Sequence, residues 1–354
     1  MAITRNNLGF SVVEEPLDDA WAEVVGTLNA SRHHQVGPHR FDWLYRRNPD
    51  GEAVLWAIRE EKTGRMVGFT VCLPRRVMVD GRVHLCWNGA DFSILPRYRT
   101  LGLAIKLRRM AKEGIDAGRA AFLYAHPNER MAVVHQKVGH VPVGPMVRYA
   151  IPLKTAPYLR RKLPAWLAQP AGTLLDPVVH LCSRYRWHRR RHEIRWVSPA
   201  RFGDHYDRLF EENATCARVV GVRDARYLNW RYATNPLYKT HAVEAWDDGR
   251  LRGYLLFIIQ DRTAQIKDVF PPQDQAVVGD LVAAAIRQAR KRGLQSASFT
   301  ALDGNPLLAQ LQRLGFRRRP DGSMMYAYAP EGSPLREVIL EQRNWFLTVG
   351  DRDV

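Results

Sequence analysis

The sequence lacks any long hydrophobic run, and this absence argues against a membrane-spanning helix. None of its apolar stretches approaches the roughly 18 residues that a membrane-spanning helix needs. The first residues, up to Pro16, also contain no apolar core of the signal-peptide type. We therefore expect a cytoplasmic protein without a membrane-spanning segment.

Cysteines and metal-binding patterns are also scarce. The four cysteines form no C-x-x-C pair and fit neither a zinc site nor a disulfide framework, so free buried thiols are expected: Cys72, Cys86, Cys182 and Cys216. Three histidines share one polar loop, but adjacent histidines point apart and no carboxylate accompanies them: His33, His34 and His39. No metal is expected.

Acidic residues are too few to balance the basic ones. The chain has 36 Asp and Glu against 53 Lys and Arg, which gives a net charge of +17. Such an excess favours an anionic partner, for example the phosphates of a small ligand, a nucleic acid, an acidic protein or an anionic membrane. The arginines are spread along the whole chain, which is more typical of a solvated basic surface, so no specific nucleic-acid partner is expected.

An internal repeat organises the chain. The pattern W-x-Y-x-x-N-P occurs at residues 43–49 and again at 230–236, an offset of 230 − 43 = 187 positions. The predicted elements around the first copy are a helix over 17–28, strands over 53–60, 66–73 and 83–95, a helix over 102–118, a strand over 120–125 and a helix over 128–139. Around the second copy they are a helix over 199–212, strands over 241–246, 251–259 and 264–270, a helix over 277–293, a strand over 296–301 and a helix over 305–315.

This order predicts an α/β fold in which helices cover a mixed α+β sheet, because some strands follow each other without an intervening helix. The expected domains are 1–153 and 192–354, joined by a connector over 154–191. The connector has prolines at 157, 164, 170 and 177 and a basic run over 184–191. We favour a linker packed across both domains, because the prolines would break a long amphipathic helix. The alternative is a surface that contacts an anionic membrane or closes over substrate.

A basic turn joins the strand over 83–95 to the helix that begins near Gly102. Arg97 and Arg99 lie in this turn, and Thr100 is positioned to cap the helix. The start of a helix presents unpaired N–H groups and the positive end of its dipole, and Gly102 lets a phosphate approach the backbone without a Cβ in the way. The turn therefore predicts an anion site.

The letters R-T-L-G-L-A at 99–104 resemble the pyrophosphate loop, [Q/R]-x-x-G-x-[G/A], of the GNAT superfamily of acyl-CoA-dependent N-acyltransferases. An asparagine after the next strand, Asn128, and the closing Gly139 resemble a second GNAT feature. The resemblance covers 9–153 and implies two tandem GNAT-like domains, acetyl-CoA or another acyl-CoA as co-substrate, and a small-molecule amine as acceptor. The residues that it implies for the coenzyme are Phe92, Ser93, Ile94, Arg97, Arg99, Thr100, Leu101, Gly102, Leu103, Ala104 and Asn128.

The second copy resembles the same fold without the loop. Its corresponding segment, 271–279, has no basic residue, and Asp274 would repel a phosphate. The closing glycine is kept as Gly315. We expect the second domain to be a degenerate copy that shapes the acceptor pocket.

The resemblance also implies candidate catalytic residues. In GNAT proteins the thioester lies between two splayed strands, and a tyrosine four residues before the closing glycine protonates the leaving thiolate. Here that position is His135, which is either the acid, with a pKa near working pH, or a helix-surface residue while the thiolate leaves unassisted. Asp91 is either the base or the partner of a nearby arginine. Tyr45 and Tyr232, from the repeat, are either acceptor contacts or packing residues.

The segment 344–353 resembles the ending of GNAT-like proteins associated with bacterial polysaccharide biosynthesis, which makes an amino sugar the first expected acceptor. Two alternatives remain. One is transfer from a charged tRNA, as in the peptidoglycan aminoacyl transferases, although that family lacks an intact CoA loop. The other is a non-catalytic module that binds CoA or a related ligand.

Overall fold

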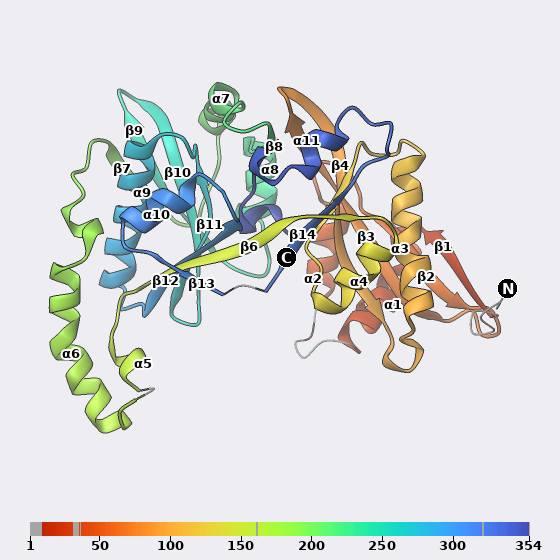
Figure 1. The fold of residues 1–354 in the computed structure, drawn as a ribbon, viewed down its shortest axis with the longest axis horizontal. Helices are drawn as coiled ribbons and strands as arrows, with labels where there is room; N and C mark the ends of the chain where they lie inside the picture. Colours follow the sequence, from red (N-terminus) through yellow and green to blue (C-terminus); the bar gives the residue numbers. More distant parts are fainter. Residues whose placement is uncertain (1–8, 31–34, 36, 161, 321, 354) are drawn as a thin grey trace.

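The computed structural model describes residues 9–353, except for 31–34, 36, 161 and 321. The described strands form one mixed sheet that runs through two halves of the molecule (Figure 1). His33 and His34 lie outside the described residues, so the prediction on the histidine cluster stays untested.

The elements of the first half are, in chain order, β1 (Phe10–Glu15), α1 (Leu17–Asn29), α2 (Pro38–Phe41), η2 (Asp42–Arg46), β2 (Val54–Glu60), β3 (Met66–Val79), β4 (Arg82–Ile94), η3 (Pro96–Tyr98), α3 (Leu101–Asp116), β5 (Leu123–Ala125), α4 (Glu129–Lys137) and β6 (Val141–Pro152). The connector forms α5 (Ala156–Leu159), α6 (Ala165–Leu181) and η4 (Arg184–Trp187).

The second half comprises β7 (Glu193–Val197), α7 (Asp204–Asn213), β8 (Val219–Gly221), α8 (Ala225–Leu228), η5 (Asn229–Ala233), β9 (Thr240–Asp247), β10 (Arg250–Gln260), β11 (Thr263–Phe270), α9 (Gln275–Lys291), β12 (Ser296–Leu302), α10 (Leu307–Arg313), β13 (Arg317–Arg319) and β14 (Met324–Tyr328). It ends with α11 (Arg336–Leu340), η6 (Gln342–Asn344), β15 (Trp345–Phe346) and η7 (Val349–Asp351).

The predicted helices and strands are present, but the prediction that each copy begins with a helix is wrong. β1 precedes α1, β7 precedes α7, and these two strands form the opposite ends of the main strand order. Neither strand contains a buried residue, so neither shows the alternation of buried and exposed side chains that identifies a strand in sequence.

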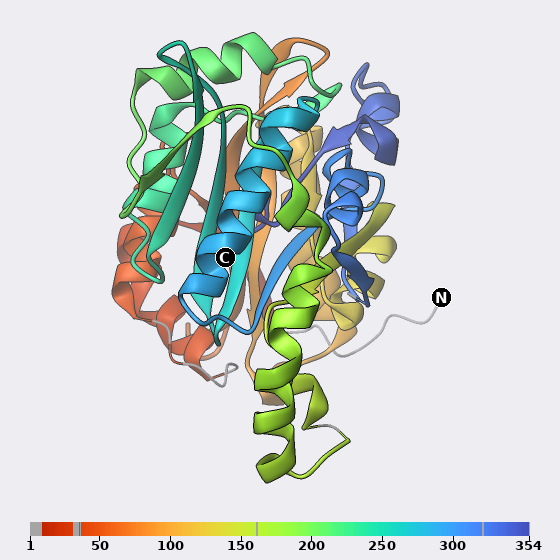
Figure 2. The same ribbon diagram turned by 90° about the vertical axis from the view of Figure 1, so that its left-hand side faces the viewer.

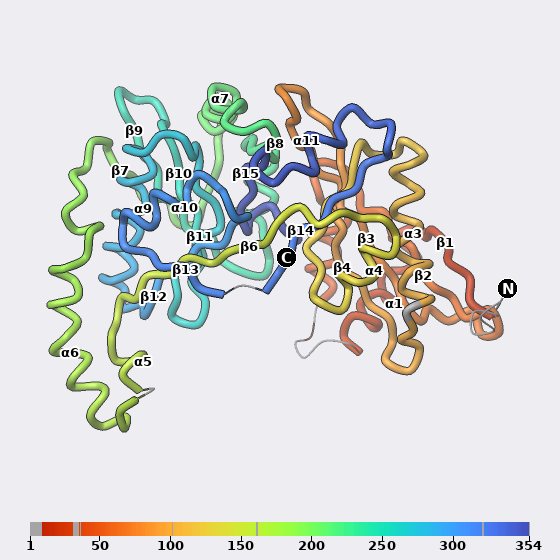
Figure 3. Tube along the Cα trace, viewed as in Figure 1, coloured from red at the N-terminus to blue at the C-terminus, as the bar shows by residue number. Residues whose placement is uncertain are grey.

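Each half is completed by a strand from the other half. β14, near the end of the chain, lies between β5 and β6 in the sheet, where Tyr326 pairs with Ala125 and Met324 with Pro145. β6 continues into the second half, where Tyr149 pairs with Phe299 of β12. Figures 1 and 3 show β6 crossing between the halves, with the C-terminus in the middle. Because of this exchange, neither half has a complete sheet without the other.

The two copies of the repeated motif meet where the halves join. The Trp43 and Trp230 rings stack with centroids 5.3 Å apart. The indole Nε1 of each donates a hydrogen bond to the carbonyl of the other, both at 2.8 Å. This reciprocal arrangement supports packing as the role of the tryptophans.

The connector contains a long helix despite its prolines, so the expectation that they would prevent one is wrong. Pro170 and Pro177 lie inside α6. Both are exposed, so the backbone carbonyls that lose their N–H partners can be hydrated. Figure 2 shows α5 and α6 projecting below the body of the molecule.

The cysteines are free thiols, as expected, but they are not all buried. Cys72 and Cys86 are buried, Cys216 is half-buried, and Cys182 is exposed just after α6 ends. Within the part of the chain that the structure describes, no helix has the length and apolar character to cross a bilayer.

Candidate functional site

β4 and β5 part in the middle of the first half. Their parallel ladder has three pairs, Trp87–Leu123, Asn88–Tyr124 and Gly89–Ala125. β5 ends at Ala125, whereas β4 continues to Ile94. β4 therefore has no pair on β5 beyond Gly89, and this parting of the strands, called the first gap below, is where the resemblance places the thioester.

A β-bulge places Asp91 beside the gap. Thr70 of β3 pairs with Phe92 and Val71 pairs with Ala90, so Asp91 has no partner on β3. The buried Asp91 carboxylate accepts hydrogen bonds from Arg40 Nη1 at 2.6 Å and from the Tyr45 hydroxyl at 2.5 Å. Asp91 is thus the partner of an arginine, the second of the two roles considered for it. Tyr45 is buried beside Asp91.

The predicted phosphate loop has the expected local structure. Thr100 caps α3, because its side chain accepts a hydrogen bond from Leu103 N at 3.4 Å, and the helix begins at Leu101. Leu103 and Ala104 are buried, while Gly102 is half-buried at the helix start. A helix start at the end of β4 presents backbone N–H groups toward an anion.

The remaining loop residues divide between the surface and the core. Arg97 is exposed and stacks on Tyr98, with its Cζ 4.6 Å from the ring centroid. Arg99 is exposed and its Nε donates to the carbonyl of Ile94 at 2.9 Å. Ser93 is buried and its hydroxyl donates to the carbonyl of Thr27 at 3.2 Å, so this side chain is directed toward α1.

A buried arginine that the sequence reasoning missed lies where β4 and β5 part. Arg108, on α3, is 2% exposed. A Cβ on Gly89, the last β4 residue paired with β5, would lie 2.9 Å from Arg108 Nη1. Its Nη2 donates to Thr70 Oγ1 at 2.9 Å, but Nε and Nη1 have no hydrogen-bond partner among the described residues. Burial lowers the pKa of this guanidinium. Sequence periodicity does mark the position, since Leu107 and Ala111 flank it on the buried face of α3.

His135 is buried on α4, so the alternative that it is a surface residue is wrong. Its Nδ1 lies 2.8 Å from Nδ1 of His140, and its ring packs against Tyr326 of the exchanged strand β14. Burial, together with Arg108 and His140, lowers the pKa of His135 well below 6.5. The ring is therefore neutral at pH 7, so the expected pKa near working pH does not hold.

The second half has the same parting of strands, but its gap is occupied by the protein itself. The β11–β12 ladder ends at Ile266–Phe299, and Lys267 is the bulge residue of β11, as Asp91 is in β4. The tail lies here: Thr348 bridges to Ala301, and Leu302 N donates to the carbonyl of Leu347 at 3.2 Å. This gap is closed to a coenzyme.

Gly350 shows how tightly the tail fits. A Cβ at this position would collide with the Tyr232 hydroxyl and the Lys267 carbonyl. Tyr232 is therefore buried beneath the tail, and the structure does not bring it to the mouth of the first gap. In the first half, Tyr45 lies beside Asp91 instead.

An ion network anchors the tail between the halves. Asp351 Oδ2 accepts from Arg223 Nη2 at 2.6 Å, and Oδ1 lies 3.5 Å from Arg75 Nη2. Its carbonyl accepts from the Tyr124 hydroxyl at 2.8 Å and from Asn88 Nδ2 at 3.3 Å. Since Asn88 and Tyr124 lie on β4 and β5, Asp351 fixes the next two residues at the mouth of the first gap.

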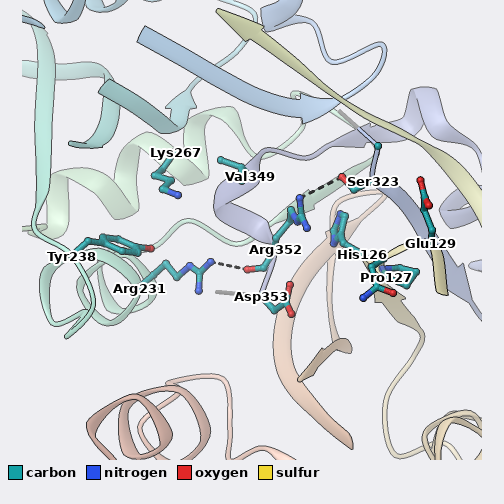
Figure 4. A pocket seen from close by; sticks show the side chains of 12 residues that line it. His126, Pro127, Glu129, Arg231, Tyr238, Lys267, Ser323, Val349, Arg352 and Asp353 are labelled. Atoms are coloured by element: carbon teal, nitrogen blue, oxygen red, sulfur yellow. Dashed lines mark hydrogen bonds between the residues drawn. The ribbon is translucent and has the colours of Figure 1, made fainter. Parts of the chain in front are cut away.

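A cavity of about 610 Å³ opens at this mouth (Figure 4). His126, Pro127, Asn128 and Glu129 line it from the first half, and Lys267 and Tyr238 from the second, with Arg352 and Asp353 of the tail between them. Asn128 also caps α4, because its side chain accepts from Met131 N at 3.0 Å.

The cavity is rich in positive charge, which shifts its titrating groups. Burial, with Arg231 and Arg352 nearby, lowers the pKa of Lys267 to about 8. Burial and the neighbouring Asp91 carboxylate raise the pKa of Asp353. Burial, with Arg352, lowers the pKa of His126 well below 6.5, and neither ring nitrogen of His126 has a partner among the described residues. A carboxylate with a raised pKa, beside cations, can accept a proton from an incoming group.

Within the described parts of the chain, no group of three or more His, Cys, Asp or Glu side chains is suited to a metal.

Sequence comparison does not identify a family for this chain. No protein-family profile matches the sequence, and no curated protein matches it significantly.

Solved structures do resemble the fold. A GCN5-related N-acetyltransferase from Anabaena variabilis superimposes with a TM-score of 0.63 at 13% identity, covering 90% of this chain and 72% of that one. A conserved Enterococcus faecalis protein described as a probable N-acyltransferase gives a TM-score of 0.62 at 13% identity, with the same coverage. Saccharomyces cerevisiae N-myristoyltransferase with bound myristoyl-CoA gives 0.57 at 14% identity, covering 93% of this chain and 84% of that one. The chain thus has the mixed α/β GNAT fold that the resemblance predicted.

Proposed function

We propose that this protein is a cytoplasmic N-acyltransferase that moves an acyl group, acetyl in the first instance, from acyl-CoA to a primary amine. One observation carries the proposal: β4 runs on past its last pair with β5 toward the Thr100-capped helix, whereas the tail bridges to β12 at the matching parting of the second half. The bound myristoyl-CoA of one structural neighbour supports a coenzyme of the acyl-CoA class.

In the proposed reaction, the amine nitrogen attacks the thioester carbonyl, an amide forms, and the carbon–sulfur bond breaks to release CoA as a thiolate. Asp353, at the mouth of the gap, takes the proton that the amine loses. We assign this step to Asp353 rather than Asp91, because Arg40 and Tyr45 already donate hydrogen bonds to Asp91. The raised pKa of Asp353 makes it a stronger proton acceptor than a carboxylate with the ordinary pKa.

Arg108 is assigned to the departing thiolate, because two of its nitrogens have no hydrogen-bond partner in the described structure and it lies where the strands part. We expect Arg108→Met to lower kcat about tenfold to hundredfold, the range for losing a hydrogen bond to a charged group. The fold should not lose stability, since removing an under-bonded buried cation relieves its desolvation cost. Steady-state kinetics and thermal unfolding measure the two effects. A normal kcat in this variant would exclude the assignment, and His135→Ala tests the alternative acid in the same assay.

The acceptor is proposed to carry an anionic group, because Lys267, Arg231 and Arg352 surround the cavity. The same cations disfavour an ammonium ion and so favour entry of the neutral amine. An amino sugar with a phosphate or carboxylate fits this description.

The lowered pKa of Lys267 predicts a pH effect on acceptor use. Lys267 is cationic below about pH 8 and neutral above it, so its attraction for an anionic acceptor is lost as pH rises through that value. Lys267→Arg keeps its charge throughout this range. We therefore expect kcat/KM at pH 9, relative to pH 7, to be higher in the variant than in the wild type for the same acceptor. Equal pH profiles would show that Lys267 does not bind the acceptor.

The activity itself is tested by incubating the protein with acetyl-CoA and paired amines that differ only in an anionic group, with free thiol as the readout. We expect thiol release with the anionic member of a pair, and a series of longer acyl-CoAs then tests the donor. Tight CoA binding without thiol release on any amine would instead indicate the non-catalytic module.

A further inference from the structure

The outer side of α6 is an apolar stripe that no described residue of the chain covers. Its residues recur at positions that place them on one side of a helix, and all are exposed: Trp166, Leu167, Pro170, Leu174, Val178 and Leu181. Trp166 is 74% exposed and Leu174 is 77% exposed. Large apolar side chains scattered singly on a surface need no explanation, but a continuous stripe along one helix marks an interaction site.

The opposite side of α6 is firmly held by the protein, so the orientation of the stripe is fixed. Gly172 packs against Ala156 so closely that a Cβ would lie 2.6 Å from that side chain. Thr155 Oγ1 donates to the carbonyl of Gly172 at 3.0 Å, and Thr155 N donates to Asp176 Oδ1 at 2.8 Å. Arg290 of α9 also donates to the carbonyl of Asp176. The apolar stripe therefore faces away from the body.

Basic residues flank both ends of the helix. Residues 154–192 contain nine Lys and Arg against one acid, Asp176, a net charge of 9 − 1 = +8. Those described as exposed are Arg160 and Lys162 before α6, and Arg184, Arg186, Arg189, Arg190 and Arg191 after it. Trp187, which is 69% exposed, lies among the latter.

We propose that α6 docks this protein on an anionic membrane surface, with the helix lying in the plane of the interface. An apolar face that carries Trp and Leu, next to a strongly basic segment, is the composition of helices that bind this way. Exposed tryptophans suit the headgroup level, and long Arg side chains can reach the phosphates from there.

Charge decides between a lipid surface and a second copy of the chain. Pairing two copies through α6 would bring two segments of +8 together, which is unfavourable. Anionic headgroups complement the same charge, and each Lys or Arg near such a surface adds to binding. The prolines on the outer side fit as well, because carbonyls without N–H partners can be hydrated at the interface.

The test is co-sedimentation of the full chain with vesicles of phosphatidylcholine alone or with a third phosphatidylglycerol. We expect binding to the anionic vesicles and at least about tenfold weaker binding to neutral ones. The double variant Trp166→Glu/Leu174→Glu should reduce binding to anionic vesicles at least about tenfold, because it removes buried apolar area and adds repulsion.

The matched control, Val83→Glu/Leu237→Glu, adds the same charge at two exposed apolar residues elsewhere and should bind nearly as the wild type does. Arg189→Gln/Arg190→Gln should weaken binding and reduce its dependence on salt. No binding to anionic vesicles, or equal losses in the two glutamate variants, would overturn the proposal. An oligomer that Trp166→Glu/Leu174→Glu dissociates without vesicles would also overturn it, because a second copy would then cover the stripe. Thiol release in the transferase assay is a separate readout, so failure here does not touch the proposed reaction.

Discussion

Gly102→Glu is expected to lower the affinity for acyl-CoA by at least about a thousandfold. The diphosphate would lose charge-assisted hydrogen bonds to the start of α3, each worth about 1.5–3 kcal/mol, and a carboxylate would repel it. The fold should be intact, because a carboxylate in the first turn of a helix is stabilising by about 0.3–1 kcal/mol. Isothermal titration with acetyl-CoA, alongside thermal unfolding, separates the two effects.

Gln275→Glu is the matched control, because it adds the same charge at the start of α9, the corresponding helix of the second half. The side chain is exposed and already accepts a hydrogen bond from Arg313 at 2.9 Å, which a carboxylate would keep. We expect unchanged affinity in this variant. Loss of binding in both variants, or in neither, would mean that the diphosphate is not held by α3.

Asp351→Ala is expected to destabilise the fold by about 3–5 kcal/mol, the cost of removing one partner from a buried ion pair. Arg75 and Arg223, which are 3% and 2% exposed, would lose a shared carboxylate. The tail would keep the hydrogen bonds of its Asp351 carbonyl to β4 and β5 but lose the carboxylate that holds it to the two arginines, so activity should fall with stability. Urea unfolding measures the change in the free energy of unfolding.

An exposed pair provides the comparison for Asp351. Asp80→Asn removes a surface ion pair with Arg218, and we expect a loss of less than about 1 kcal/mol. A similarly small loss for Asp351→Ala would show that the tail does not hold the halves together.

Burial opposes the charge of Asp351, but Arg223 and Arg75 outweigh burial and lower its pKa. Its contribution to stability is therefore complete above about pH 4, its unfolded pKa, and is lost as pH falls through the lower folded pKa.

The sequence predicted the features that depend on local signals. Thr100 caps α3 as expected, because a capping side chain needs only the N–H groups of the next few residues. The periodic apolar residues of α3 and the strand that precedes it were equally readable. The mixed sheet followed from the order of these elements, and the GNAT fold from the resemblance of the loop over 99–104 to that family's pyrophosphate loop.

The features that the sequence could not supply depend on contacts between distant residues. β14 completes the sheet of the first half. Nothing in its five residues predicts that it pairs with strands of the first half instead of strands of its own half. Asp353 reaches the mouth of the first gap only because the tail fills the second one. Periodicity can place Arg108 on the buried face of α3, but only the packing of that helix shows that its guanidinium lies where β4 and β5 part. The prolines in the connector led to the wrong prediction that no long helix forms there, because the effect of a proline depends on which side of the helix faces water.

A crystal structure of the protein with acetyl-CoA bound tests most directly which gap holds the coenzyme. We predict one molecule per chain, with its diphosphate at the backbone of Leu101 and Gly102 and its pantetheine arm between β4 and β5. Density for the nucleotide at α9, or a diphosphate bound away from α3, would contradict the assignment of the site to the first half.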